Sequence, residues 1–201
     1  MIQGALLAAL MQKCAPSTDI RTMAAIVAVE SAGDSWAVRD PDAAVGVHPA
    51  SYAAAVALAH GLLIHGHRVA VGLSQVLLPR AGLDSATLLG SPCANIRAGA
   101  SVLSYFYGRE IGVVPNPSSE RGQQTALRRA LSAYNSGSPT GAPGYTALVL
   151  GALHAPFVSH ITAFADADVP AVSVPVAAPA KPLAPPTVQH VSSVFFSDGS
   201  R

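Results

Sequence analysis

Residues 22–36 read TMAAIVAVESAGDSW, and this stretch joins an apolar helix face to a single carboxylate. Met23, Ile26 and Val27 have the spacing of one helix face, and Glu30 falls on the same face one turn later. A carboxyl group in an apolar pocket holds its proton towards neutral pH, because desolvation disfavours the charged form. That is the protonation state of a general acid, so Glu30 is the first candidate for a functional residue. The pattern leaves one alternative open, a glutamate at a helix end that only reaches solvent beside Gly33.

The composition of the 201 residues suits packed helices. Hydrophobic residues make up 50% of the chain, aromatic residues 5% and charged residues 11%. The net charge of +1 gives no electrostatic reason to bind nucleic acid. No run of about 18 apolar residues is free of charges and helix breakers, so a transmembrane span is not expected. We therefore expect an all-α fold with at most a short hairpin.

Periodic apolar positions and capping residues predict helices over most of the first part of the chain, and residues 1–154 are expected to form one domain. Ser17, Ser51 and Ser91 are plausible helix caps. Residues 36–50 are expected to form a loop or short hairpin, and residues 66–90 an irregular stretch. The predicted helices cover residues 2–13, 17–31, 51–65, 92–107, 119–136 and 144–154.

The composition changes after His154, and residues 155–201 are expected to form a largely disordered tail rich in proline, alanine and valine. Six prolines fall between Val169 and Val188, and proline at that density removes backbone donors and prevents a helix or a central strand. Near the end of this tail, Phe195 and Phe196 form a small apolar patch that could dock on a partner. The sequence therefore predicts a folded domain followed by an extended segment.

Neither a metal nor a cofactor is expected. The two cysteines, Cys14 and Cys93, are too few for a metal cage and lack CxxC spacing. They are either two buried thiols or one long-range disulfide of an oxidising compartment. Among the histidines His60, His65 and His67, the first two are five residues apart and do not share a helix face. The GLSQV and NSG segments lack the glycine and lysine spacing of phosphate loops.

Several short motifs follow one another along the chain: CAP at Cys14, AVES at Glu30, GLSQV at residues 72–76, PCANIRAGASVL from Pro92, AYNSG at residues 133–137 and GY at Tyr145. Together they resemble the lytic transglycosylases of the lysozyme-like superfamily, in particular the branch associated with type IV secretion and conjugation systems. The resemblance covers roughly residues 12–152. It implies an all-α, lysozyme-like fold with a cleft for a peptidoglycan strand between two helical lobes.

The resemblance also assigns a role to each motif. Glu30 would be the single catalytic acid, and Ser31 would position its carboxyl group or a sugar group. Gln75 would hydrogen-bond the sugar, although its segment departs from the family pattern at Ser74, where methionine is common, and at Leu77, where asparagine is common. The substrate-binding residues implied are Ser31, Gly72, Ser74, Gln75, the cleft-lining pair Tyr134 and Asn135, and Tyr145, which would close the cleft.

The same resemblance has consequences for location and partners. It places the CAP and PC segments near each other, which implies a disulfide between Cys14 and Cys93 in the exported protein. Peptidoglycan strands are the implied ligand, so the periplasm or cell envelope is the expected location, although no export signal is evident at the start of the sequence. Envelope proteins of a secretion system are the expected partners of the C-terminal tail.

The remaining carboxylates agree with a one-acid mechanism. Ordinary glycosidases place two carboxylates at the scissile bond. Here Asp34 falls in the glycine-rich helix exit, where capping explains it, and Glu110 and Glu120 look like solvated surface charges. A lytic transglycosylase needs one carboxylate, because the muramyl 6-hydroxyl acts as the nucleophile and a 1,6-anhydro sugar results. The alternatives are a hydrolytic muramidase of the same fold and a glycan-binding assembly protein without catalysis.

Overall fold

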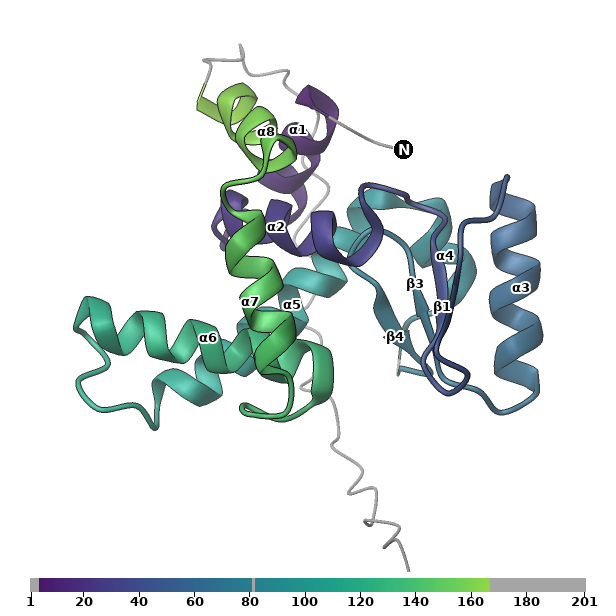
Figure 1. Cartoon of the computed structure of the whole chain (residues 1–201). Coiled ribbons are helices and arrows are strands. Elements are labelled where there is room, and N and C mark those ends of the chain that lie inside the picture. The colour runs from purple at the N-terminus through teal and green to yellow at the C-terminus, as the bar shows by residue number, and fades with distance from the viewer. Residues whose placement is uncertain (1–3, 81, 167–201) are drawn as a thin grey trace, which may run out of the picture. The chain divides into compact units, whose positions relative to one another are not determined.

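The computed structural model describes residues 4–80 and 82–166, the last five of them as backbone only. Figure 1 shows helices α1, α2, α7 and α8 gathered on one side of the described region, with the strands and α3 on the other. The helices are α1 (Ala5–Cys14), α2 (Ile20–Ser31), α3 (Tyr52–Ile64), α4 (Ser85–Gly90), α5 (Pro92–Ile111), α6 (Glu120–Ser136), α7 (Pro143–Ala152) and α8 (Pro156–Asp166). The strands are β1 (Val38–Asp40), β2 (Val45–Val47), β3 (Val69–Val71) and β4 (Val76–Leu78).

Two separate hydrophobic cores hold these elements together. The first is built around α2, whose residues Met23, Ile26 and Val27 are fully buried against α1, α5, α6, α7 and α8. This confirms the apolar helix face that leads to Glu30. The second core lies between one face of the sheet and helices α3 and α4, and Val38, Val71 and Leu88 are among its buried members.

The expectation of at most a short hairpin is wrong, because the four strands form one antiparallel sheet in the order β2-β1-β3-β4. The β1–β2 hairpin falls in residues 36–50, where a loop or hairpin was expected. The β3–β4 hairpin falls in residues 66–90, which were expected to be irregular. Strand β3 of this hairpin also pairs with β1, where Val38 lies opposite Val71. In the sequence, these two residues are separated by the whole of α3. The second lobe is therefore a sheet covered by helices and not a helical lobe.

The predicted helices are found in nearly their predicted places, and four of them start at a side-chain cap, namely Asp19, Ser51, Ser91 and Ser119. Ser51 and Ser91 accept hydrogen bonds from the backbone nitrogens of residues 54 and 94, as their positions predicted. Helix α2 is different, because Asp19 and not Ser17 caps it, with 2.9 Å between its Oδ1 and the Thr22 nitrogen. The short helix α4 was not predicted, since it lies in the stretch expected to be irregular.

Helix α8 occupies the beginning of the segment expected to be a tail. Pro156 stands at the first position of this helix, where the missing N–H is not needed. Val158 and Ile161 are buried in the first core, where α8 packs against α1 and α2. Figure 1 shows α8 lying beside α1. The folded part therefore continues past residue 154, to at least the end of α8. The proline-rich segment, with Phe195 and Phe196, lies outside the described residues.

Glu110 also differs from expectation, since it is buried and not a solvated surface charge. Its Oε2 lies 2.5 Å from Nε of Arg129, so the two side chains join α5 to α6. In the part of the chain that the structure describes, no helix combines the length and the hydropathy required to cross a bilayer.

Candidate active site

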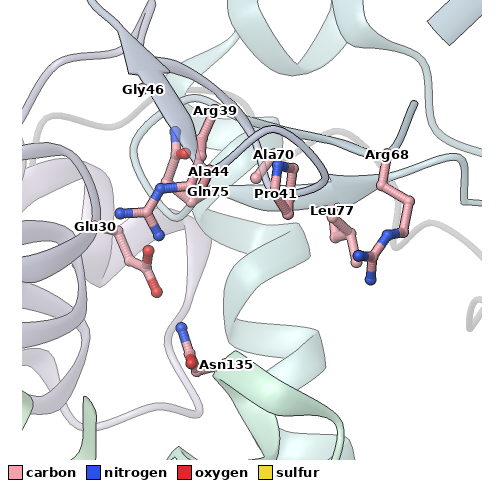
Figure 2. A pocket seen from close by; sticks show the side chains of 10 residues that line it. All are labelled: Glu30, Arg39, Pro41, Ala44, Gly46, Arg68, Ala70, Gln75, Leu77 and Asn135. Atoms are coloured by element: carbon pink, nitrogen blue, oxygen red, sulfur yellow. The ribbon is translucent and has the colours of Figure 1, made fainter. Parts of the chain in front are cut away.

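Glu30 projects from the last turn of α2 into an open cleft. The helix ends directly after it, because Ala32 and Gly33 adopt left-handed backbone conformations, with φ of 51° and 82°. The cleft has a volume of about 490 Å³ and runs from Glu30 across the outer face of the sheet. In Figure 2 the Glu30 carboxylate points towards the side of the cleft where Asn135 lies. The lining residues are Glu30, Arg39, Pro41, Ala44, Gly46, Arg68, Ala70, Gln75, Leu77 and Asn135.

Burial raises the pKa of the Glu30 carboxyl group above its ordinary value. The Tyr145 hydroxyl and the Arg39 guanidinium act in the opposite direction, and burial outweighs both. The Tyr145 hydroxyl lies close enough to influence this pKa, but its geometry falls short of a regular hydrogen bond to any described residue. Glu30 is therefore a half-buried acid that keeps its proton to a higher pH than an exposed glutamate does.

Ser31 does not line the cleft. Its side chain is 3% exposed, and its hydroxyl donates a hydrogen bond of 2.9 Å to the backbone oxygen of Leu73. The same hydroxyl accepts a hydrogen bond from the Gly33 nitrogen. Ser31 thus ties the end of α2, and with it Glu30, to the turn that joins β3 to β4. The structure gives it a positioning role and leaves it no free face for a sugar.

The turn between β3 and β4 is held from behind by Asn95 of α5. Its Oδ1 accepts from the Ser74 nitrogen and its Nδ2 donates to the Val71 oxygen, both at 2.8 Å. Gly72 has a φ of 75°, and a Cβ atom there would lie 2.3 Å from Nδ2 of Asn95, so only glycine fits. Gly72 and Ser74 are both buried and do not line the cleft. Sequence reasoning assigned no role to Asn95, although it lies in the quoted PCANIRAG motif.

Gln75 lines the cleft and is fixed in place. Its backbone has a φ of 45°, and its Nε2 donates to the backbone oxygens of Ala37 and Gly72 at 3.1 Å and 3.0 Å. Both hydrogens of the amide group are therefore used within the protein. Only Oε1 remains for a ligand, so Gln75 can accept a hydrogen bond from a sugar hydroxyl or amide but cannot donate one.

Tyr134 and Tyr145 form a stacked pair, with ring centroids 6.4 Å apart and ring planes 8° from parallel. Tyr134 lies behind the cleft, where its hydroxyl donates a hydrogen bond of 2.7 Å to the Ser74 oxygen. Burial raises the pKa of both phenols, so both are neutral hydrogen-bond donors.

The remaining predicted site residues are Tyr145 and Asn135. Tyr145 lies beside Glu30, and its hydroxyl is unpaired among the described residues. Asn135 is exposed on the cleft wall. Of the predicted site residues, Glu30, Gln75 and Asn135 therefore line the cleft, and Tyr145 adjoins it.

One cluster of possible metal ligands borders the cleft, at Asp40, Asp42 and His67, with ligand atoms within 4.8 Å of one another. These groups already have partners. Asp40 accepts from His67 at 2.7 Å and from the backbone nitrogens of Asp42 and Ala43. Asp42 accepts three hydrogen bonds from Arg68, two of them from the guanidinium. The cluster therefore acts as a brace that fixes the β1–β2 hairpin to the start of β3.

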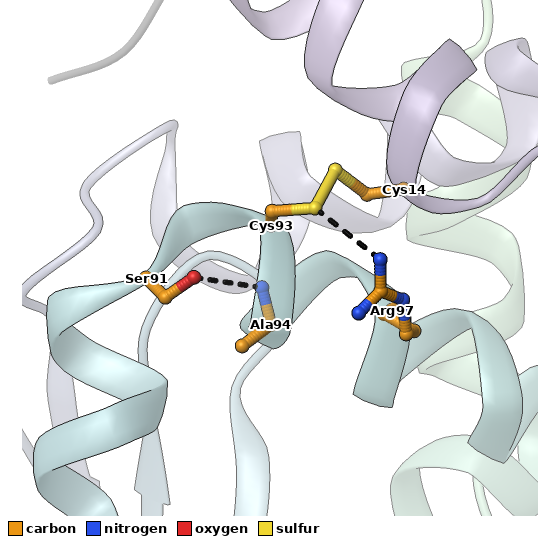
Figure 3. The surroundings of a disulfide bond; sticks show 5 residues. All are labelled: Cys14, Ser91, Cys93, Ala94 and Arg97. Atoms are coloured by element: carbon orange, nitrogen blue, oxygen red, sulfur yellow. Dashed lines mark hydrogen bonds between the residues drawn. A yellow bond between two sulfur atoms is a disulfide. The ribbon is translucent and has the colours of Figure 1, made fainter. Parts of the chain in front are cut away.

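Cys14 and Cys93 form a disulfide, as the resemblance implied. Cys14 is the last residue of α1 and Cys93 lies in the first turn of α5, with 5.4 Å between their Cα atoms. Figure 3 shows Arg97, one turn further along α5, directing its guanidinium towards the Cys93 sulfur, 3.7 Å away. Of the two possibilities that the sequence left open, the bridge is the one present. It lies outside the cleft and joins two helices of the first core.

Comparisons with known proteins give a family and several relatives. Residues 8–141 match the family model described as the Transglycosylase SLT domain. The Type IV secretion system protein virB1 of Brucella abortus biovar 1 (strain 9-941) is 36% identical over 135 residues, which cover 66% of this chain and 54% of that protein. The protein of the same name from Brucella suis biovar 1 (strain 1330) has the same identity and coverage. Protein virB1 of Agrobacterium fabrum (strain C58 / ATCC 33970) is 32% identical over 131 residues, covering 64% of this chain and 51% of that protein.

The chain spans about half the length of these curated relatives. No solved structure matches it. The resemblance to lytic transglycosylases that the motifs indicated is confirmed by the family match. Since that match covers residues 8–141, more than half of the chain, the protein belongs to the transglycosylase SLT domain family.

Proposed function

We propose that this chain is a peptidoglycan lytic transglycosylase in which Glu30 is the catalytic acid. The proposal rests on the position of Glu30 in the cleft and on the absence of a second carboxyl group among the described lining residues. Among the described residues that line the cleft, Glu30 alone has a carboxyl group, and burial raises its pKa. A hydrolase with two catalytic carboxylates would need a second one across the scissile bond. A cleft with a single carboxylate suits a reaction in which the substrate supplies the nucleophile.

In the first step, protonated Glu30 donates its proton to the glycosidic oxygen between N-acetylmuramic acid and N-acetylglucosamine. The bond from this oxygen to C1 of the muramyl sugar breaks, and the 2-acetamido group supports the positive charge that develops at C1. Glu30 is left as a carboxylate. General acid catalysis of this kind contributes about 10²–10⁴-fold to the rate.

In the second step, the Glu30 carboxylate takes the proton of the muramyl 6-hydroxyl while that oxygen bonds to C1. The product is a 1,6-anhydromuramyl end, no water is consumed, and Glu30 regains its proton. Gln75 would accept a hydrogen bond from the sugar through Oε1, Asn135 would contact it from the opposite wall, and the Tyr145 hydroxyl would donate to it or to Glu30. Ser31 would act indirectly, by holding the helix that carries the acid.

We further propose that the protein opens peptidoglycan in the cell envelope for the assembly of a type IV secretion or conjugation apparatus. The support is the identity of 36% with a protein that bears the name Type IV secretion system protein virB1. An oxidising compartment such as the periplasm is consistent with the Cys14–Cys93 disulfide. Contacts of secretion-system proteins with the proline-rich segment remain a prediction, because that segment lies outside the described residues.

The test compares the wild-type chain with Glu30→Gln on purified peptidoglycan, with mass spectrometry of the released muropeptides. The amide keeps the shape of the side chain but cannot donate and recover a proton, so cleavage should fall by at least about 10²-fold. Glu120→Gln, which removes an exposed carboxylate outside the cleft, is the matched control and should cleave at the wild-type rate.

The three possible outcomes of this test identify three different functions. Anhydromuramyl ends, lighter than reducing ends by one water, support the transglycosylase. Reducing ends that depend on Glu30 would instead identify a hydrolytic muramidase. A wild-type chain that binds peptidoglycan but releases nothing would identify a glycan-binding assembly protein, and the catalytic assignment of Glu30 would be wrong.

A further inference from the structure

One of the two cations in the cleft has a partner and the other does not. Arg68 is held by Asp42, with Nε and Nη2 at 2.9 Å and 2.6 Å from the same carboxylate oxygen. The side chain of Arg39 makes no hydrogen bond or ion pair with any residue in the described ranges 4–80 and 82–166. In Figure 2 its guanidinium points back along the cleft towards Glu30. An arginine is always charged, so the cleft carries an unpaired positive charge next to the candidate acid.

The backbone of Arg39 is fixed while its side chain has room on both sides. It is the central residue of β1, and its neighbours Val38 and Asp40 are buried on the opposite face. In register, it pairs with Gly46 of β2 and with Ala70 of β3, which place no long side chain beside it. A Cβ atom added at Gly46 would meet nothing within 4 Å, so the space there is open. The backbone of Arg39 is therefore held in the sheet, and its neighbours on the adjacent strands are the small residues Gly46 and Ala70.

Glu30 forms no ion pair with Arg39 in the described structure. Burial raises the pKa of the Glu30 carboxyl group, so this group keeps its proton to a higher pH than an exposed glutamate does. A guanidinium presents a planar fork of N–H donors that matches a carboxylate, and it is less strongly hydrated than an ammonium group. The unpaired group in the cleft thus has the chemistry of a carboxylate receptor.

We propose that Arg39 is a specificity-determining residue that binds a carboxylate carried by the muramyl sugar, so that the cleft prefers anionic glycan strands to neutral ones. The proposal rests on the proposed function in so far as the ligand is peptidoglycan. The carboxylate has two possible sources, the free lactyl group of a strand without peptides and a carboxylate of an attached stem peptide. A neutral β-1,4-linked N-acetylglucosamine oligomer has the same backbone and neither group.

The experiment measures binding by calorimetry in the full chain with Glu30→Gln, so that no ligand is cleaved. The ligands are three oligomers of equal length: the neutral N-acetylglucosamine oligomer, an alternating muramyl oligomer with free lactyl groups, and the same oligomer with stem peptides. Adding Arg39→Gln should weaken binding of at least one carboxylated oligomer about fivefold, the upper range for an exposed ion pair. Binding of the neutral oligomer should change less than about twofold, and Arg39→Lys should recover part of the loss.

The control and the salt dependence separate recognition from a general effect of charge. Arg21→Gln removes the same charge from the exposed start of α2, outside the cleft lining, and should leave all three affinities unchanged. The advantage of the carboxylated oligomers should shrink as salt is raised, because salt screens exposed charges. A loss confined to one carboxylated oligomer identifies the source of the carboxylate.

Two results would overturn the proposal. One is that the Glu30→Gln chain binds the carboxylated oligomers no more tightly than the neutral oligomer. The other is that Arg39→Gln weakens the neutral and carboxylated oligomers equally, or weakens none of them. Because cleavage is not measured, a failure of this proposal is distinct from a failure of the transglycosylase assignment, which depends on the products released by the wild-type chain.

Discussion

Opening the Cys14–Cys93 disulfide should lower the free energy of unfolding by about 4.5 kcal/mol. The bridge closes a loop with a sequence separation of 79 residues. In the chain-entropy model, a loop of this size restricts the unfolded chain by about 15 cal/mol/K, which gives that free energy at 25 °C. For a chain of this length, the corresponding fall in Tm is about 9–18 °C. The helices that the bridge joins, α1 and α5, belong to the same core, so the native contacts of Leu7 and Met11 should survive reduction.

The assay is urea unfolding of the wild-type chain with and without reductant, together with the double variant Cys14→Ala/Cys93→Ala. The reductant should destabilise the wild type and leave the double variant unchanged, because the variant has no bridge to open. Cleavage per folded molecule should persist at low temperature, since no residue of α1 lines the cleft. A loss of less than about 1 kcal/mol in both tests would refute the entropic reasoning and show that the unfolded chain is already restricted without the bridge.

Two further predictions concern Tyr145 beside Glu30 and the packing of α5 behind the β3–β4 turn. Tyr145→Phe removes a hydroxyl group that lowers the pKa of Glu30. The alkaline limb of the pH profile of kcat/KM, where Glu30 loses its proton, should therefore move to higher pH. A move to lower pH would contradict the assignment of Glu30 as the acid. Gly99→Ala should destabilise the chain by about 1–3 kcal/mol and slow cleavage, because the new Cβ atom would lie 2.4 Å from the Cβ of Ser74. Gly108→Ala, on the same helix but with nothing within 4 Å, should be neutral or stabilising in the same urea titration.

The local pattern around Glu30 predicted its position well. The face formed by Met23, Ile26 and Val27 is buried, and the acid emerges at the end of that face into a cleft, not into bulk solvent. A helix period of 3.6 residues is visible in one short stretch of sequence, so neither an alignment nor a long-range contact is needed to find it. The alternative of an exposed helix-end glutamate is excluded by its half-buried side chain.

The sheet could not be predicted in the same way. Each strand has three residues, too few for an alternating pattern to differ from chance. The pairing that fixes its order joins Val38 to Val71, and no local feature of either residue specifies the other. The bonds of Asn95 to the β3–β4 turn span 21 and 24 residues and are equally invisible in a single sequence. Arg39 was missed as a cleft residue for this reason, because its place depends on the sheet.

The tail was expected to begin after His154, where the composition changes, but helix α8 extends the folded part beyond that point. Pro156 is tolerated at the first position of α8, and Val158 and Ile161 then follow at a helical spacing of three residues. These two side chains belong to the core around α2, and a contact over such a long sequence separation is not visible in the local composition.

The surroundings of Glu30 suit a carboxyl group that must act first as an acid and then as a base. Burial favours the protonated form, which the first step of the proposed reaction consumes. Burial alone would make the resulting carboxylate costly, and the second step requires that carboxylate to persist until the 6-hydroxyl closes on C1. Arg39 and Tyr145 both favour the ionised form, so they limit the cost that burial imposes. In this proposal Arg39 has two roles in the cleft. Its positive charge stabilises the ionised form of Glu30, and its guanidinium, which has no partner among the described residues, can also bind a carboxylate of the substrate.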